Sequence, residues 1–342
     1  MRYGKVFVTA LLCVLAGNAA AQGSTATPAT DAGVGQPEHL DAVVVTGKVA
    51  GPGLWHVYRD DTHDLWIMGT LSPRPAGIEW DASEVRSLVA ASQEVLWAPG
   101  YGIDVKANLF RQASLGIGYL RARKNPDGRS LKDVLSPDLH ARWLQAKARY
   151  LPRDSGVERQ RPIIAAQALF DAAVKQARLS DKPIVYPAMK DAIEQNGVKS
   201  TFPQVRVSMT SAQAKAALAD VRRMQLDDEE CLAATIDAVQ TDIPQMVANA
   251  NAWATGQVGN IRFAALQRRD AACSDALMKP GFSARYGLPD IQDSIAALWV
   301  SEARAALARN TSTVAFVPMQ NLIGPDNYLD RLRAQGYTVS GP

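Results

Sequence analysis

The chain of 342 residues carries 37 basic and 34 acidic side chains, so its formal net charge is only +3. Because a nucleic-acid-binding protein needs a concentrated basic surface, this near-balance argues against nucleic acid as a partner. The length allows one large or two small domains with a sizeable core.

The first 21 residues are typical of a secretory signal peptide. Arg2 and Lys5 precede an apolar run over residues 6–16, and small residues end the segment at Ala21. We expect cleavage near Ala21 and a periplasmic or secreted protein. The run is too short to span a bilayer and no other stretch of about 18 apolar residues follows, so we expect no membrane span. Loss of the two basic residues lowers the formal charge to about +1.

Two cysteines remain once the signal peptide is removed. Cys231 and Cys273 form an even pair in an exported chain, which is most simply a disulfide. Closing the loop between them would stabilise the fold by roughly 4 kcal/mol in the chain-entropy model. Two unpaired buried thiols are the alternative. Neither cysteine has a histidine nearby in the sequence, so we expect neither to act as a nucleophile.

Residues 22–52 are rich in Thr, Ala, Gly and Pro, which predicts a flexible N-terminal segment. One apolar island, LDAVVVTG at residues 40–47, interrupts it. The island resembles the segment that TonB-dependent outer-membrane receptors present to their energy-coupling partner. An accessory edge strand or a linker is the alternative interpretation.

The folded part is predicted to begin with two strands joined by a polar turn. Leu54–Tyr58 and Leu65–Met68 are apolar segments on either side of turn-forming residues. The second strand ends at Gly69 and Thr70, and the carboxyl ends of strands are where open α/β sheets usually bind ligands. Thr70 to Ser72 is therefore a candidate site, with a plain β-turn as the alternative.

The remainder is predicted to be a helical middle followed by further strands. A capping box at Asp81–Glu84 predicts a helix to Ala91. Helical spacing, caps and proline starts predict helices over 105–178 (with new starts at 137 and 162), 188–196, 211–278, 291–309 and 326–334. Apolar runs predict strands over 94–98, 183–186, 204–209, 313–319 and 337–340. Because strands cluster at both ends, we expect an α/β (α+β) fold whose central mixed sheet is built from N- and C-terminal strands.

Both ends of the folded part carry motifs similar to those of the TraB/GumN family, which includes the Tiki-type membrane proteases. The opening stretch GLWHVYRDDTHDLWIMGTLSP, residues 53–73, resembles a family pattern in which a strand ends in GTxH. Residues 314–339, VAFVPMQNLIGPDNYLDRLRAQGYTV, resemble the closing pattern with a second GxxH. The matches lie in the family's order, so the resemblance assigns residues 53–342 to one TraB/GumN-like domain.

The resemblance implies a metal-dependent hydrolase site in which two histidines and strand-end acids hold a divalent ion that activates water. This chain differs at each of those positions. Ser72 and Asn321 stand at the histidine positions, Pro318 at the closing glycine, Ala98 at the acid after the third strand, Ser208 or Met209 at a later glutamate, and Ile295 and Ala296 at an Arg-Asn pair. Serine and asparagine are weak ligands and alanine is none, so we expect no metal and no cofactor.

A binding groove is the expected use of this region. Five tryptophans lie in or beside its bordering segments: Trp55, Trp66, Trp80, Trp97 and Trp299. Tryptophan is usually a core residue, and a groove wall formed by Trp97 is the functional alternative. The candidate cleft consists of Gly69, Thr70, Ser72, Trp97, Ala98, Gln320 and Asn321. Its neutral hydrogen-bonding groups would suit an uncharged peptide or glycan.

We therefore expect an exported TraB/GumN-like protein with a degenerate hydrolase site that acts as an envelope binding or scaffold protein, its partner being an uncharged peptide or glycan or an envelope protein. Two alternatives stay open. One is an active hydrolase or peptidase with a non-standard site, such as Ser72 with Asp61 or Glu302. The other is an accessory to TonB-dependent uptake that acts through residues 41–47.

Overall fold

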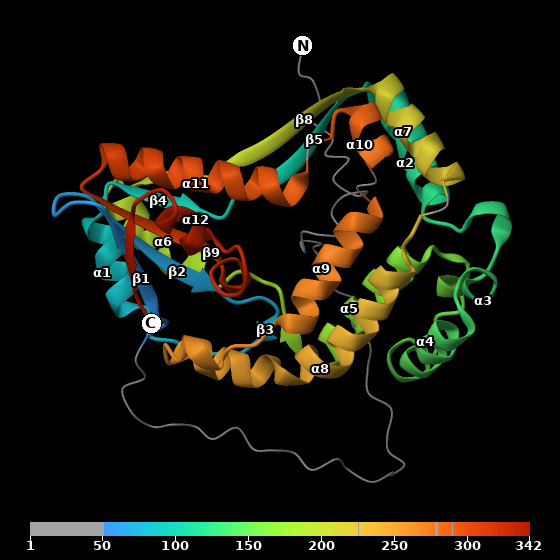
Figure 1. The fold of residues 1–342 in the computed structure, drawn as a ribbon, viewed down its shortest axis with the longest axis horizontal. Helices are drawn as coiled ribbons and strands as arrows, with labels where there is room; N and C mark the ends of the chain where they lie inside the picture. Colours follow the sequence, from blue (N-terminus) through green and yellow to red (C-terminus); the bar gives the residue numbers. More distant parts are fainter. Residues whose placement is uncertain (1–50, 225, 278–279, 289) are drawn as a thin grey trace, which may run out of the picture.

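The structure is a computed structural model that describes residues 51–342 except 225, 278–279 and 289. The predicted signal peptide and the apolar island at residues 40–47 lie outside the described residues. Figure 1 shows a sheet with flanking helices at one end of the molecule and a helical bundle at the other. The predicted α/β fold is confirmed.

The central sheet is built from strands of both chain ends, as the sequence predicts. Its order is β10-β1-β2-β9-β4-β7. The pairs β10–β1 and β1–β2 are antiparallel, and the pairs β2–β9, β9–β4 and β4–β7 are parallel. The strands are β1 (Leu54–Tyr58), β2 (Asp64–Thr70), β4 (Glu94–Trp97), β7 (Lys199–Thr201), β9 (Ser312–Pro318) and β10 (Thr338–Ser340). The interior residues 313–317 of β9 are all buried, as expected for a strand covered on both faces.

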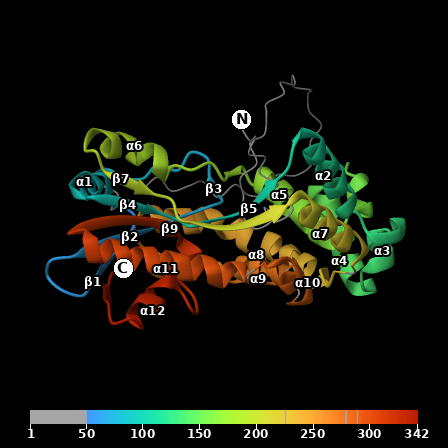
Figure 2. The same ribbon diagram turned by 90° about the horizontal axis from the view of Figure 1, so that it is seen from above.

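Helices cover both faces of this sheet (Figure 2). The helices α1 (Ser83–Ala91) and α6 (Val185–Gln195) lie on one face. The helices α11 (Ile291–Arg309) and α12 (Tyr328–Arg333) lie on the other. The apolar faces of these helices enclose the sheet, and the side chains of both belong to one continuous core.

The middle of the chain forms a helical bundle beside the carboxyl ends of the parallel strands (Figure 1). Its helices are α3 (Leu131–Val134), α4 (Pro137–Tyr150), α5 (Pro162–Gln176), α8 (Glu229–Ala254) and α9 (Ala264–Leu277). The predicted helix starts at Pro137 and Pro162 are confirmed. Proline suits these positions because the first turn of a helix has no use for the missing N–H.

A third unit, here called the arm, extends away from the sheet. The parallel strands β5 (Gly100–Lys106) and β8 (Gln204–Thr210) lead to α2 (Leu109–Ala122) and α7 (Ser211–Arg223), beside α10 (Pro280–Tyr286). These five elements are the arm. It has a small core of its own, formed by Leu115, Ala122, Ala214, Leu218 and Val221.

Some local predictions are wrong. Residues 183–186 do not form a strand, because α6 begins at Val185 and its Pro187 is tolerated in the first turn. The Asp81–Glu84 capping box does not form: the N-cap is Ala82, and Asp81 accepts the backbone N–H of Ser83 instead. Four strands had no predicted counterpart: β3 (Arg74–Pro75), β5, β6 (Leu179–Ser180) and β7.

A buried carboxylate joins the strands at the amino end of the parallel region. Glu94 opens β4, is 1% exposed, and accepts hydrogen bonds from Arg309 at 2.7 Å and Asn310 at 2.8 Å. Lys199 of β7 lies at 3.1 Å, and the Thr201 hydroxyl also donates. Burial raises the pKa of Glu94, but these hydrogen bonds outweigh it and hold the pKa at about 2. One side chain thus connects β4, β7 and the segment between α11 and β9.

Replacing Glu94 is expected to destabilise the fold. Glu94→Gln leaves Arg309 without its carboxylate, so we expect the free energy of unfolding to fall by about 3 kcal/mol or more. Because the folded pKa of about 2 lies below the ordinary 4.5, the carboxylate's contribution is complete above about pH 5. It is lost as the pH falls toward 2. Urea unfolding of wild type and variant across this range should show the difference shrinking with acid.

The control for this measurement is Glu84→Gln, at an exposed position of α1. Its effect on stability should be within about 0.5 kcal/mol. A Glu94→Gln variant with the same small effect, or an effect independent of pH, would contradict the role given to Glu94.

Candidate functional site

The parallel strands bring the ends of β2, β9 and β4 to one edge of the sheet. In register, Thr70 lies beside Pro318, and Trp97 lies beside Phe316. The candidate residues follow these ends: Gly69, Thr70 and Ser72 on β2 and beyond, Trp97 and Ala98 at the end of β4, and Gln320 and Asn321 in the turn η5 (Met319–Asn321) after β9. The structure therefore brings the predicted segments together, although their side chains meet different neighbours.

Gly69 is a packing position. Its carbonyl accepts a hydrogen bond from Nε1 of Trp253, at the end of α8, over 2.6 Å. A Cβ atom on Gly69 would lie 2.5 Å from Cε of Met319, so a larger residue would require the Met319 side chain to shift. Trp253 fixes the helical bundle to the sheet here, and nothing in the sequence pairs these two residues.

Ser72 meets a carboxylate. The chain after Ser72 forms β3, which pairs with β6, and this pairing places the Ser72 hydroxyl 3.3 Å from Oδ1 of Asp181. The partners considered from the sequence lie on other elements, Asp61 in the turn between β1 and β2 and Glu302 on α11. A serine nucleophile needs a base to take its proton, and a long, exposed contact to a carboxylate is a weak form of that arrangement.

Polar side chains link α5 and α9 to η5. Asp171 accepts from Gln167 at 2.6 Å, and Gln167 accepts from the guanidinium of Arg269 at 3.0 Å. Arg269 also pairs with Asp270 at 2.9 Å, and the other oxygen of Asp270 accepts from Gln320 at 3.4 Å. The contact between Ser72 and Asp181 lies beside this set. We call all seven residues the polar row: Ser72, Asp181, Asp171, Gln167, Arg269, Asp270 and Gln320.

The carboxylates of the polar row are partly exposed, and Arg269 is its buried member. Burial raises the pKa of Asp270, while Arg269 and the hydrogen bond from Gln320 act in the opposite direction. Burial also raises the pKa of Asp171, and the charge of Asp181 adds to this. Arg269 is 6% exposed, and its Nε has no hydrogen-bond acceptor. The row holds carboxylates around one guanidinium and contains no imidazole, so it is suited to positioning polar groups.

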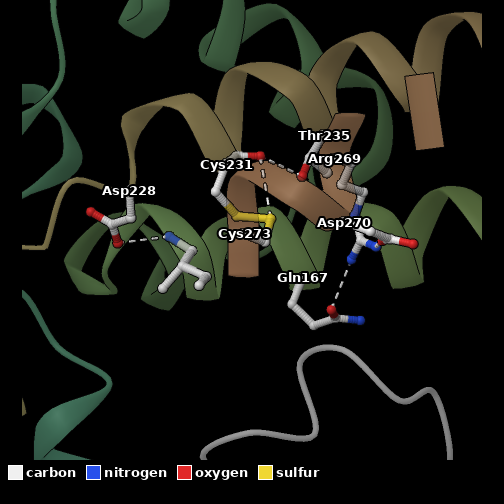
Figure 3. The surroundings of a disulfide bond; sticks show 8 residues. Gln167, Asp228, Cys231, Thr235, Arg269, Asp270 and Cys273 are labelled. Carbon is white, nitrogen blue, oxygen red and sulfur yellow. Dashed lines mark hydrogen bonds and ion pairs between the residues drawn. A yellow bond between two sulfur atoms is a disulfide. The ribbon is translucent and has the colours of Figure 1, made fainter. Parts of the chain in front are cut away.

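A disulfide holds the helix that carries Arg269 and Asp270. Cys231 of α8 and Cys273 of α9 are bonded, with sulfur atoms 1.99 Å apart, and both are buried. Figure 3 shows the bond, with Arg269 and Asp270 on the same helix as Cys273 and Gln167 nearby. The predicted pairing of the two cysteines is confirmed.

The positions matched to metal ligands do not fit a metal ion. Ser72 contacts Asp181, and Ala98 has no donor atom in its side chain. The Asn321 amide donates to the Tyr328 hydroxyl at 3.2 Å, which directs it toward the α11–α12 face of the sheet. Ser208 and Met209 lie on β8 in the arm, and Ile295 and Ala296 lie on α11. Within the described part of the chain, no three His, Cys, Asp or Glu side chains are grouped to hold a metal.

The described histidines lie on other parts of the molecule. His56 of β1 contacts Asp64 at 2.5 Å and stacks on Trp66. His63 contacts Asp60 in the turn that follows β1. His140 is on α4. None of these contacts involves the carboxyl ends of β2, β9 or β4.

Trp97 belongs to an aromatic patch on the α6 face of the sheet. Its ring centroid lies 4.9 Å from Phe316, 5.2 Å from Tyr186 and 5.6 Å from Phe202. Trp97 is 8% exposed, whereas Tyr186 and Phe202 are 42% and 53% exposed. Nε1 of Trp97 is buried and has no acceptor among the residues that the structure describes. We call Trp97, Tyr186 and Phe202 the aromatic patch; the sequence indicated only Trp97, because the three lie far apart in the chain.

A cavity of about 480 Å³ lies on another side of η5, between β1, the α8–α9 connection and α12. Trp55, Phe263 and Leu329 supply apolar walls, and Arg333 lies at its border. Gln267 lines it and donates to the carbonyl oxygens of Gln320 and Ile323 at 3.3 and 3.2 Å. This glutamine lies on the same helix as Arg269 and Asp270, and it helps to hold η5 in place.

Removing the disulfide is expected to destabilise the protein and loosen α9. The double variant Cys231→Ala, Cys273→Ala should lose roughly 2–4 kcal/mol of unfolding free energy, since the cross-link restricts the unfolded chain. Thermal unfolding with and without a reductant checks this. The reductant should lower the melting temperature of the wild type and leave the double variant unchanged. Equal melting temperatures for oxidised and reduced wild type would contradict the prediction.

The comparisons with known proteins agree with the motifs at both ends of the folded part. No curated protein and no solved structure matches the chain. The model of the TraB/PrgY/gumN family matches residues 53–341, which is nearly all of the folded part. The chain therefore belongs to the TraB/PrgY/gumN family.

Proposed function

We propose that this protein is an exported binding or scaffold protein of the cell envelope in which the hydrolase site expected from the family resemblance is degenerate. The proposal rests on the residues at the positions that match the family's metal ligands and on the contacts that they make. Ser72 and Asn321 are bound to Asp181 and Tyr328, and Ala98 has no donor to offer. None of the three supplies an imidazole or a carboxylate ligand.

The aromatic patch is the proposed binding surface for an uncharged peptide or glycan. Tyr186 and Phe202 expose large rings, on which the apolar faces of sugars or side chains can pack. The buried Nε1 of Trp97 has no acceptor, and such an orphan donor is costly in the free protein. If the ring of Tyr186 or Phe202 moved aside, an oxygen of the ligand would accept the hydrogen bond from Nε1 of Trp97. A neutral ligand with many acceptor oxygens therefore suits this surface best.

Changes in the aromatic patch are expected to weaken binding. Trp97→Phe keeps an aromatic ring and removes the donor, so affinity should fall about fivefold, the value of one hydrogen bond. The double variant Tyr186→Ala, Phe202→Ala should lower it by at least about tenfold. Isothermal titration with neutral oligosaccharides and uncharged peptides measures both.

Trp299→Phe is the matched control. Trp299 is also buried with an Nε1 that lacks an acceptor, but it lies on α11, across the sheet from the aromatic patch. Its replacement should leave the affinity unchanged. If no neutral ligand gives a saturable signal, or if Trp299→Phe weakens binding as much as Trp97→Phe, the aromatic patch is not the binding surface.

The alternative of an active hydrolase is favoured by one contact, the hydrogen bond from Ser72 to Asp181. A hydrolase that uses this pair would lose turnover in Ser72→Ala and in Asp181→Asn. We expect instead that the wild type shows no turnover on peptide and ester panels, with or without divalent metal, and that Ser72→Ala folds normally. Turnover that disappears in both variants would replace the binding proposal with the hydrolase.

A further inference from the structure

Helix α2 is apolar on two faces. Its inner face contributes Leu115 and Ala122 to the core of the arm. On its outer face, Phe110, Ile117 and Leu120 are 86%, 54% and 58% exposed. Their spacing of seven and three residues places them on one stripe of the helix. A contiguous exposed apolar stripe of this kind marks an interaction surface.

Positive charge surrounds the apolar stripe. Residues 100–124, 204–223 and 280–286, which are the arm together with the two residues that follow α2, contain ten Lys and Arg residues against only Asp104 and Asp220. These segments together have a formal charge of +8, and the rest of the chain has −5, since the whole is +3. Both acids are already paired, Asp104 with Arg206 at 3.3 Å and Asp220 with Arg285 at 2.9 Å. The charge asymmetry is hidden by the balanced overall composition.

The outer face of α2 combines both features. Arg121 follows the apolar residues, and helical spacing places it on the same side as Ile117 and Leu120. Lys124 is exposed two residues after the end of α2. No acidic residue lies in α2. Large apolar side chains beside Arg and Lys, without acids, are typical of helices that lie in a membrane interface.

We propose that the outer face of α2 docks on the surface of an anionic phospholipid bilayer. Phe110, Ile117 and Leu120 would enter the boundary between headgroups and acyl chains, and Arg121 and Lys124 would contact lipid phosphates. Apolar insertion and charge together are the two signals that peripheral binding requires. In the part of the chain that the structure describes, no helix is long and apolar enough to cross a membrane.

A second copy of the chain is a poorer occupant of this face. A symmetric contact between two arms would bring two surfaces of +8 together, and like charges across an interface are unfavourable. An anionic lipid surface is complementary to the same charge. The proposal does not depend on the ligand of the aromatic patch, which lies on another unit of the molecule.

The test is flotation of the processed chain with lipid vesicles. Wild type should bind vesicles of equal parts phosphatidylglycerol and phosphatidylcholine, bind pure phosphatidylcholine far less, and dissociate as salt is raised. The triple variant Phe110→Ser, Ile117→Ser, Leu120→Ser should lower the partition coefficient by at least about tenfold. The variant Arg121→Gln, Lys124→Gln should lower it by roughly thirtyfold.

The matched control replaces exposed apolar residues outside the arm. Leu144 of α4 and Val247 of α8 are each 47% exposed, and Leu144→Ser, Val247→Ser should bind vesicles as the wild type does. Circular dichroism confirms that each variant is folded. Equal binding to both vesicle types would overturn the proposal, and so would a triple variant that binds as the wild type does. It would also be overturned if the wild type does not bind vesicles and the triple variant instead abolishes self-association or nucleic-acid binding.

Discussion

The insertion of β9 between β2 and β4 is the constraint on which the rest of the structure depends. Strands β2 and β4 do not pair with each other, and both pair with residues 312–318 of β9. Strands β2 and β4 lie near the start of the folded part of the sequence, and β9, which lies between them in the sheet, comes near its end. The chain between β4 and β9 must therefore leave this pair of positions and return to it before the sheet is complete. Such non-local pairing carries a large loop-closure cost and is expected to slow folding.

Several specific contacts stabilise this return of the chain. Glu94 ties the segment before β9 to β4 and β7 through Arg309 and Lys199. Trp253 and Gln267 attach the helical bundle to the carboxyl ends of the strands. At the carboxyl edge of the strands, the polar row lies on the bundle side and the aromatic patch lies on the α6 face. The residues of the candidate cleft therefore lie in two different environments, one polar and one aromatic.

Sequence patterns predicted elements whose burial is strong and regular. The helix over 291–309 and the strand over 313–319 were predicted almost to the residue, because each has a long apolar pattern with clear ends. The β5–β8 pair was only half predicted: Gly100 and Gly102 lower the strand propensity of β5, and neither strand is fully buried. The contacts of Glu94 could not be predicted either, since its partners come from residues 199–201 and 309–310.

The candidate site shows the same division between local and non-local information. The motifs located the strand ends and identified Ser72 and Asn321 as substitutions. They did not indicate Asp181, Arg269 or Asp270, because these approach from β6 and α9 only after the bundle has packed. Trp97 was indicated as an aromatic wall, but the exposure of its neighbours depends on α6 and β7, whose positions no local pattern specifies.

Arg161 gives the arm a mechanical connection to the polar row. This buried guanidinium immediately precedes α5 and donates to the carbonyl oxygens of Ala122, at the end of α2, and Val221, near the end of α7. The helix that it begins carries Gln167 and Asp171. Neither α2 nor α7 can tilt independently of α5 without breaking a buried hydrogen bond to Arg161, so the ends of both helices are coupled to the helix that borders the strand ends.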